Sequence, residues 1–416
     1  MNWKALTKDE ILKRVEDALA ENGNYDSIPI LGIPGTYLDE DEFYRDAPFL
    51  EKAPFLKTLI ANPNHIGCHT MGNKSLGIFK GTQEIERELI NLCAEEIFKG
   101  EKDQQDGYVA TGGTEANMEA MWIYRNYFIK EYGASADQIG VLYSEDTHYS
   151  IAKGCDLLQV KSILLPVNKT TRQIDYSIMD KQIRRAKKNG VKYFIVVLNM
   201  STTLFGSVDE IDPVVNYLDD HKLVFKLHLD AAFGGFIYPF TNPYSQHNFA
   251  NPRVSSISID AHKMLQTPYG TGMFLIRKGF MQYVATDEAQ YVPGLDFTIC
   301  GSRSGANAIV IWMLLMNYGS KGWTAKMAEL MERTEYLCNR LDEMGIQYYR
   351  NPHLNIVTIK ANNIPSKIAL KYELVADTYE APPSWWKIVV MSHVKYNILD
   401  AFLTEVEASL AQKKVY

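Results

Sequence analysis

The stretch SISIDAHKML, residues 256–265, decides how this chain is interpreted. Its first half alternates serine with isoleucine, which is typical of a buried β-strand that stops at Asp260. His262 and Lys263 stand directly past that end, where a poorly hydrated lysine amine can act as a nucleophile toward an aldehyde. The alternative is an ordinary surface lysine at a strand end, and a His-Lys pair alone does not decide between the two.

Short β-rich runs alternate with helical stretches on both sides of this strand. The strand candidates are QIGVLYS, KSILLPV, KYFIVVLN, VFKLHLD and GMFLIRK, and the helix candidates between them are residues 114–130, 177–189 and 208–220. This alternation indicates an α/β fold with a mostly parallel sheet covered on both faces. Such sheets bind ligands beyond the carboxyl ends of their strands, where most of the motifs below fall.

Two further regions flank the α/β core. The N-terminal region predicts an amphipathic helix in the first 23 residues, an irregular stretch at 24–80 and a helix at 82–98. The C-terminal region predicts a long charged helix, two short strands (NIVTIKA and WKIVVMSHV) and a last helix. We therefore expect a wrapping segment at 1–60, a large domain at 61–310 and a small α+β domain at 311–416.

Composition narrows the class of function. The net charge of −7 argues against nucleic acid as a main partner, because a phosphate backbone requires a basic surface. The first residues carry charges throughout, which is unlike a signal peptide or a membrane anchor. Five scattered cysteines without a CxxC pair fit reduced thiols and provide no zinc site. We expect a cytoplasmic protein with no bound metal and no membrane partner.

Two strand ends carry residues suited to a flat heteroaromatic ligand. In FKLHLDAAFGGF, Asp230 can keep a pyridine nitrogen protonated through a charge-assisted hydrogen bond, and Ala232 is small enough to lie against a ring. In LYSEDTHYSIAKG, His148 can stack on the ring. Asp230 can equally cap the next segment, and a lone histidine is commonly structural.

Glycine-rich turns supply two candidate phosphate sites. In YVATGGTEANMEAMW, Gly112, Gly113 and Thr114 precede a helix whose first amides can bind an anion. In TICGSRSGANA, Ser302 and the nearby amides form a second turn of this kind. Turns of this kind are common in proteins, so neither one identifies a phosphate site by itself.

Taken in order along the chain, these motifs resemble the group II pyridoxal-phosphate decarboxylases, which include glutamate, aspartate, tyrosine, histidine, serine and aromatic amino-acid enzymes. The resemblance covers roughly residues 60–320, through TGGTEAN, DTHYS, NMSTTLFGSVDEI, HLDAAFGGF, DAHKM and GSRSG. It implies the aspartate aminotransferase-like, type I fold of pyridoxal-phosphate enzymes, with a mostly parallel seven-stranded sheet and a small C-terminal α+β domain. It also implies a homodimer with shared active sites.

The resemblance assigns roles to single residues. Lys263 would form the internal aldimine with pyridoxal 5'-phosphate, and His262 would contact the phosphate. Asp230 would pair with the pyridine nitrogen, with Ala232 and His148 on opposite faces of the ring. The remaining cofactor contacts would come from Gly112, Gly113, Thr114, Thr202 (or Thr203) and, for the neighbouring subunit, Ser302.

The implied reaction is loss of CO₂ from an L-amino acid to give the amine, and the identity of the amino acid stays open. Our hypothesis for the proton donor at Cα is Tyr291, with His148 as the alternative; Tyr291 is one of 25 tyrosines, so it also fits a residue without a catalytic role. Aldehyde-lyase cleavage, as in the sphingosine-phosphate lyases, and transamination are the alternative reactions. A binding protein without activity would need neither Lys263 nor Asp230.

Overall fold

The structure is a computed structural model that describes residues 1–22, 64–66, 79–286 and 295–413. The chain divides into two compact units, Met1–Ala134 with Asn248–Gly322, and Ser135–His247 with Trp323–Tyr416. The domain limits expected from the sequence, near residues 60 and 310, stay a prediction. Within the described residues, no helix has the length and apolar character needed to cross a membrane.

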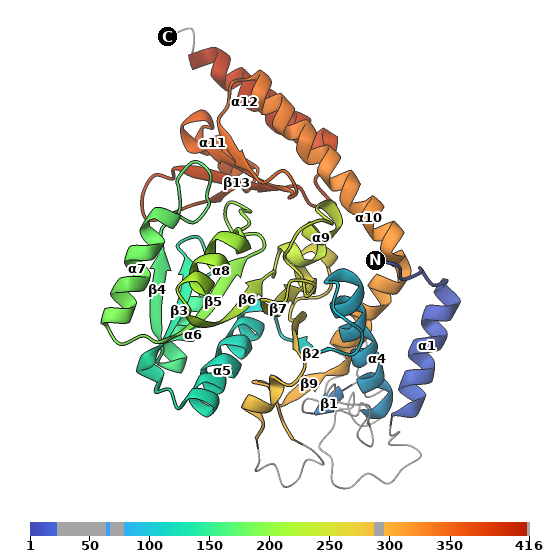
Figure 1. The fold of residues 1–416 in the computed structure, drawn as a ribbon. Coiled ribbons are helices and arrows are strands. Elements are labelled where there is room, and N and C mark those ends of the chain that lie inside the picture. Colours follow the sequence, from blue (N-terminus) through green and yellow to red (C-terminus); the bar gives the residue numbers. More distant parts are fainter. Residues whose placement is uncertain (23–63, 67–78, 287–294, 414–416) are drawn as a thin grey trace, which may run out of the picture. The chain divides into compact units, whose positions relative to one another are not determined.

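Seven strands form the main sheet, in the order β2-β8-β7-β6-β5-β3-β4 (Figure 1). Their bounds are β2 Gln105–Ala110, β3 Ile139–Ser144, β4 Lys161–Leu165, β5 Tyr193–Asn199, β6 Val224–Asp230, β7 Val254–Asp260 and β8 Gly272–Arg277. The pairs β3–β4, β3–β5 and β5–β6 are parallel, whereas β8 is antiparallel to both β2 and β7. The predicted α/β fold with a mostly parallel seven-stranded sheet is confirmed.

The strands that the sequence predicted are the apolar ones. β3 and β7 are buried along their whole length, and β5 is buried except at Tyr193, as parallel strands covered on both faces require. β2 was not expected, because it begins with Gln105 and Asp106, residue types that are rare in strands. Both of these polar residues are nevertheless buried.

In the first unit, helices pack against both faces of the strands. The helices of this unit include α1 Lys8–Glu21, α4 Lys80–Asn91, the π-helix η3 Leu92–Ile97 and α5 Gly113–Tyr132. α1 is capped by Thr7, whose side chain forms a capping box with Glu10. α5 is fixed to β7 by buried hydrogen bonds, among them one from Ser258 Oγ to Asn117 Oδ1 of 2.7 Å.

The first unit also holds the short pair β1 Asn64–Ile66 and β9 Ser302–Ser304, which run antiparallel. α10, Gly305–Glu343, follows β9 and continues into the second unit. Its helical dihedrals are interrupted at Gly319, where φ is 59° and an added Cβ would lie 2.4 Å from the Ala5 nitrogen. Glycine therefore permits both the kink and the close approach of the N-terminal chain.

In the second unit, helices cover the parallel strands and a small sheet follows. The helices are α6 Ser150–Leu158, α7 Tyr176–Lys188, α8 Ile211–Asp220, α9 Tyr238–Thr241, α11 Ser366–Lys371 and α12 Tyr396–Lys413. The small sheet is antiparallel, in the order β10-β11-β13-β12, with bounds β10 Tyr348–Arg350, β11 Ile356–Lys360, β12 Val375–Ala376 and β13 Trp385–Val389. α12 lies alongside the C-terminal part of α10 (Figure 1), and both pack on this sheet through Leu341, Val357 and Phe402.

Candidate active site

Lys263 lies in η6, Ala261–Leu265, a short π-helix that starts where β7 ends. Single π turns of this kind are common at functional sites. The Lys263 Nζ lies 3.0 Å from Asp260 Oδ2; the lysine side chain is 34% exposed and that of Asp260 only 4%. A buried carboxylate therefore holds an amine that solvent still reaches.

His262, in the same turn, is oriented from one side of its ring. Its Nδ1 lies 2.7 Å from the carbonyl oxygen of Thr271. Because a carbonyl only accepts, Nδ1 is the donor, and Nε2 is the ring atom that faces Asp260, at 3.6 Å. The ring is therefore fixed beside the same carboxylate that contacts Lys263.

The Gly112–Thr114 turn meets this carboxylate at the start of α5. The Gly113 amide donates to Asp260 Oδ1 at 2.5 Å. A Cβ at Gly112, where φ is 153°, would lie 3.3 Å from His262 Cε1, so a side chain there would crowd the turn. The first hydrogen bond of the helix runs from the Ala116 amide to Gly112, so the amides of Thr114 and Glu115 have no acceptor within the helix, and that of Gly113 is engaged by Asp260.

We call these first-unit residues, Gly112–Thr114 and Asp260–Lys263, the lysine half. They fit pyridoxal phosphate: an accessible amine, an imidazole and helix-terminal amides lie around one carboxylate, with glycine where a Cβ would intrude. Amides at a helix N-terminus suit the phosphate, and the lysine suits the aldehyde.

The ring half, as we call the second-unit residues His148, Thr202, Asp230 and Ala232, is built at the ends of β3, β5 and β6. Asp230 ends β6 in register with Asn199 of β5 and is 5% exposed. Its Oδ1 accepts the Ala232 amide at 3.1 Å. This contact closes a short turn directly after β6.

A buried Asn-Asp pair joins the strand ends of the ring half. The Asn199 amide nitrogen Nδ2 lies 2.6 Å from Asp209 Oδ2 and 2.8 Å from Thr147 Oγ1, and the Asn199 backbone N–H donates to Asp209 Oδ2 at 2.8 Å. Burial raises the pKa of Asp209 to about 7. Because Thr147 precedes His148, this pair fixes the turn that carries the imidazole.

A second brace holds the same turn through an ion pair. The Arg172 guanidinium binds both oxygens of Asp146, with its Nε 2.9 Å from Asp146 Oδ2. The guanidinium also stacks on Phe205, 3.8 Å from the ring centroid. Since Phe205 belongs to the loop of Thr202, Arg172 connects the two loops of the ring half.

His148 and Thr202 are both held locally. The His148 Nδ1 lies 2.9 Å from Ser150 Oγ, and its ring lies 4.1 Å from that of Tyr149. The buried Thr202 places its Oγ1 2.7 Å from Ser207 Oγ, whereas Thr203 is exposed.

The remaining predicted residues lie in or beside the segment before α10. Ser302 is exposed in β9, paired with Ile66. Next to it, Arg303 forms a buried ion pair with Glu86, so this arginine braces the turn. Tyr291 lies outside the described residues.

Sequence reasoning missed the residues that support the predicted ones: Asp260, Asn199, Asp209, Asp146 and Arg172. Asp260 had a readable signal, because it stands three residues before Lys263 in one turn. The others come together only through the strand order.

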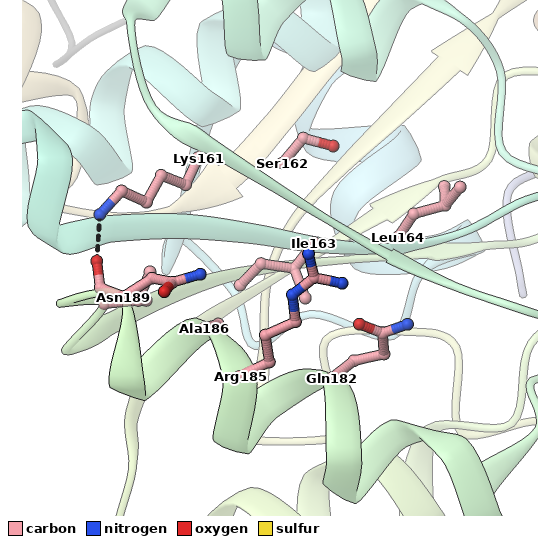
Figure 2. A pocket seen from close by; sticks show the side chains of 9 residues that line it. Lys161, Ser162, Ile163, Leu164, Gln182, Arg185, Ala186 and Asn189 are labelled. Carbon is pink, nitrogen blue, oxygen red and sulfur yellow. Dashed lines mark hydrogen bonds between the residues drawn. The ribbon is translucent and has the colours of Figure 1, made fainter.

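Other site types find little support in the described residues. No group of His, Cys, Asp and Glu there has the arrangement of a metal site. A hollow of about 470 Å³ lies along β4 and α7 and contains none of the predicted residues. Figure 2 shows Arg185 and Gln182 beside this hollow, with Lys161 bonded to the carbonyl oxygen of Asn189.

Comparison with known proteins places this geometry in a family context. Residues 82–357 match the family described as "Pyridoxal-dependent decarboxylase conserved domain". A tryptophan decarboxylase of Clostridium sporogenes is 47% identical over 96% of each chain, and an L-aspartate decarboxylase of Thermococcus kodakarensis is 30% identical over 97% of each. The structure of an L-methionine decarboxylase from Streptomyces sp. 590 aligns with a TM-score of 0.72, covering 97% of this chain and 95% of that one at 20% identity, which shows a shared fold.

Proposed function

The chain belongs to the pyridoxal-dependent decarboxylase family, and from this premise we propose that its substrate is an aromatic L-amino acid, tryptophan first. The protein is a pyridoxal-phosphate-dependent carboxy-lyase that converts an L-amino acid into the amine and CO₂. The observation that carries the substrate proposal is the similarity, over nearly the whole chain, to the clostridial tryptophan decarboxylase. The aspartate decarboxylase covers as much of the chain with fewer identities.

In the lysine half, we assign cofactor binding to Lys263, His262 and the Gly112–Thr114 turn. Lys263 is the amine that captures the cofactor aldehyde, supported by its exposure and by its buried carboxylate partner. The Thr114 and Glu115 amides at the start of α5 suit the phosphate, and His262 lies beside the Gly112 backbone.

In the ring half, we assign Asp230 to the pyridine nitrogen, with His148 and Ala232 on the two faces of the ring and Thr202 beside it. Asp230 suits this role because it is a buried acid at the end of β6. The bound cofactor supplies an electron sink for the bond that breaks. An acid at the pyridine nitrogen strengthens that sink, so Asp230 would act directly on the reaction.

Decarboxylation replaces the carboxylate at Cα by a proton, so the protein needs a donor there. Our two candidates are Tyr291 and His148. The Nδ1 contact of His148 with Ser150 engages one ring nitrogen in a local hydrogen bond. Tyr291→Phe and His148→Gln distinguish the two. The variant that lacks the true donor should bind substrate normally and protonate Cα more slowly, and the other variant should not show this slower protonation.

The proposal extends to assembly and location. We propose a cytoplasmic homodimer in which Ser302 serves the phosphate of the neighbouring subunit. Ser302 is exposed on β9, as a residue that acts outside its own subunit must be. The scattered cysteines fit a reducing compartment.

The test offers tryptophan, phenylalanine, tyrosine, histidine, methionine, aspartate and glutamate separately to purified protein saturated with pyridoxal phosphate. Mass spectrometry follows amine, CO₂ and keto acid. We expect tryptamine and CO₂ from tryptophan, with other aromatic amino acids next. Lys263→Ala should abolish turnover, a loss on the order of 10³-fold or more, whereas Lys13→Ala, on the exposed face of α1, should not change it.

Other outcomes would replace parts of the proposal. Amine from aspartate or glutamate alone would overturn the aromatic assignment while keeping the decarboxylase. Keto acid without CO₂ would indicate transamination, and turnover of aldehyde-lyase substrates alone would indicate carbon–carbon cleavage.

A further inference from the structure

Three buried side chains of the first unit share too few protons for their contacts. Tyr108 of β2 and Glu119 of α5 are fully buried, and Glu115, one turn before Glu119, is 7% exposed. The Tyr108 Oη lies 3.0 Å from Glu115 Oε1 and 3.2 Å from Glu119 Oε2. We call these residues the Tyr108 triad.

The two contacts at Tyr108 Oη need two hydrogens, and the phenol supplies one. A tyrosine hydroxyl donates one hydrogen, and an ionised carboxylate only accepts. With both glutamates ionised, one of the two contacts at Tyr108 Oη would hold no hydrogen and would set two oxygens against each other inside the protein. One glutamate must therefore be protonated and donate to the phenol.

The surrounding donors indicate which glutamate it is. Glu115 Oε2 accepts from the Thr111 backbone N–H at 2.8 Å and from Thr111 Oγ1 at 2.6 Å, so Glu115 has the donors that a carboxylate needs. Among the described residues, the backbone donor to Glu119 is the Ile299 amide, at 3.2 Å on Oε2, and its Oε1 is buried without a partner. Ionisation would thus cost more at Glu119.

The charges around Glu119 act in the same direction. The acids that face it are Glu115 on α5 and Asp296 in the segment before β9. The positive charge of Arg303, whose guanidinium carbon lies 5.1 Å from the centroid of the Tyr108 ring, is engaged by Glu86 of α4, and the Cys300 thiol is close to Glu115. Burial, with a smaller contribution from these acids, raises the pKa of Glu119 to about 8, although the contacts with Tyr108 and Ile299 lower it.

We propose that Glu119 is the proton-bearing member of the Tyr108 triad at neutral pH and that its proton keeps residues 296–301 docked against α5. The Ile299 amide is the contact between that segment and Glu119. The segment leads directly into β9 and Ser302, while Thr111, which binds Glu115, stands next to Gly112. Glu119 is therefore a positioning residue that connects two turns, and the proposal does not depend on which amino acid is the substrate.

The pH dependence follows from the same contacts. Above about pH 8, Glu119 loses its proton in the folded protein, and the new buried charge then repels Asp296 of the segment as well as Glu115, an effect that the hydrogen bond from Ile299 opposes. Docking of 296–301 should weaken, and its amides should exchange with solvent more often.

Hydrogen–deuterium exchange on the purified full-length protein tests this, between about pH 6 and about pH 9. Glu119→Gln is the decisive variant, because its amide keeps the size of the glutamate side chain and carries no charge at any pH, while its oxygen can still accept from the Ile299 amide as Oε2 does. The ratio of wild-type to variant exchange in peptide 296–301 cancels the intrinsic pH effect and should rise about tenfold over this range. The exposed Glu16→Gln on α1 should match wild type throughout.

Two results would overturn the proposal. Parallel profiles for wild type and Glu119→Gln would show that this proton does not control docking. Loss of the pH dependence in Glu115→Gln but not in Glu119→Gln would assign the proton to Glu115.

A second measurement covers the case in which Glu119→Gln does not fold. Infrared spectroscopy of the wild-type protein with ¹³C-labelled glutamate should show the carbonyl stretch of a neutral glutamic acid at about pH 7, disappearing with a midpoint of about 8. A spectrum without that band at neutral pH would also overturn the proposal.

Discussion

The lysine half and the ring half hold their candidate groups in different ways. In the lysine half these groups contact one another, because Asp260 binds both Lys263 and the Gly113 amide. In the ring half, Asp230 and His148 stand beside a separate framework in which Asn199 binds Asp209 and Arg172 binds Asp146. A motif that carries its own partners can be recognised from a short sequence, whereas a motif supported from elsewhere depends on residues that share no segment with it.

The largest effect we expect on stability is in the ring-half framework. Arg172→Ala leaves the Asp146 carboxylate, with a side chain 11% exposed, without its bidentate partner, which should cost about 3–5 kcal/mol of unfolding free energy. Urea unfolding measures this. The control is Arg184→Ala, whose pair with Asp180 is solvent-exposed and should matter little. Equal costs for the two variants would mean that the Arg172 brace is not a structural framework.

Asp230→Asn tests the candidate group without changing the framework beside it. Asparagine still accepts the Ala232 amide, so stability should change by less than about 1 kcal/mol. Without the charge, kcat should fall by about 10²- to 10³-fold, or about 3–4 kcal/mol. Steady-state kinetics measure this change, with the exposed Asp220→Asn on α8 as the control variant. A loss of stability at unchanged kcat would instead make Asp230 a structural cap.

Asp209 should give the ring half a pH-dependent stability. Its folded pKa of about 7 lies above the ordinary value of 3.8, so the folded state keeps a proton that the unfolded chain has released. Stability should therefore fall as pH rises from about 4 to about 7, by on the order of 1 kcal/mol per pH unit. In Asp209→Asn, the midpoint of urea unfolding should depend less on pH over this window. If the midpoint changes with pH as it does in the wild type, another group dominates the pH dependence.

The sequence predicted those parts of the fold whose signals are local. Apolar runs located β3 to β8, and the helical stretches located α5, α7 and α8. His148 and Lys263 were expected just past a strand and Asp230 at a strand tip, and they follow β3, follow β7 and end β6, respectively. These features depend on neighbours within a few residues, which periodicity detects.

The parts that were missed depend on distant partners. β2 forms through its antiparallel pairing with β8, and nothing in its own segment, which begins with the polar residues Gln105 and Asp106, indicates this partner. Arg172 reaches Asp146 across 26 positions, and the Ile299 amide reaches Glu119 across 180. Spacing along one chain does not reveal which loops the strand order brings together.

The smallest effect should come from Asp260→Asn in the lysine half. Asparagine still accepts the Gly113 amide and loses only the charge 3.0 Å from a lysine that is already 34% exposed. Solvent screens that pair, so the unfolding free energy should fall by only about 1 kcal/mol. Urea unfolding beside Arg172→Ala is the direct comparison. A cost as large as that of Arg172→Ala would show that the lysine half also depends on a buried charge framework, and the contrast between the halves would fail.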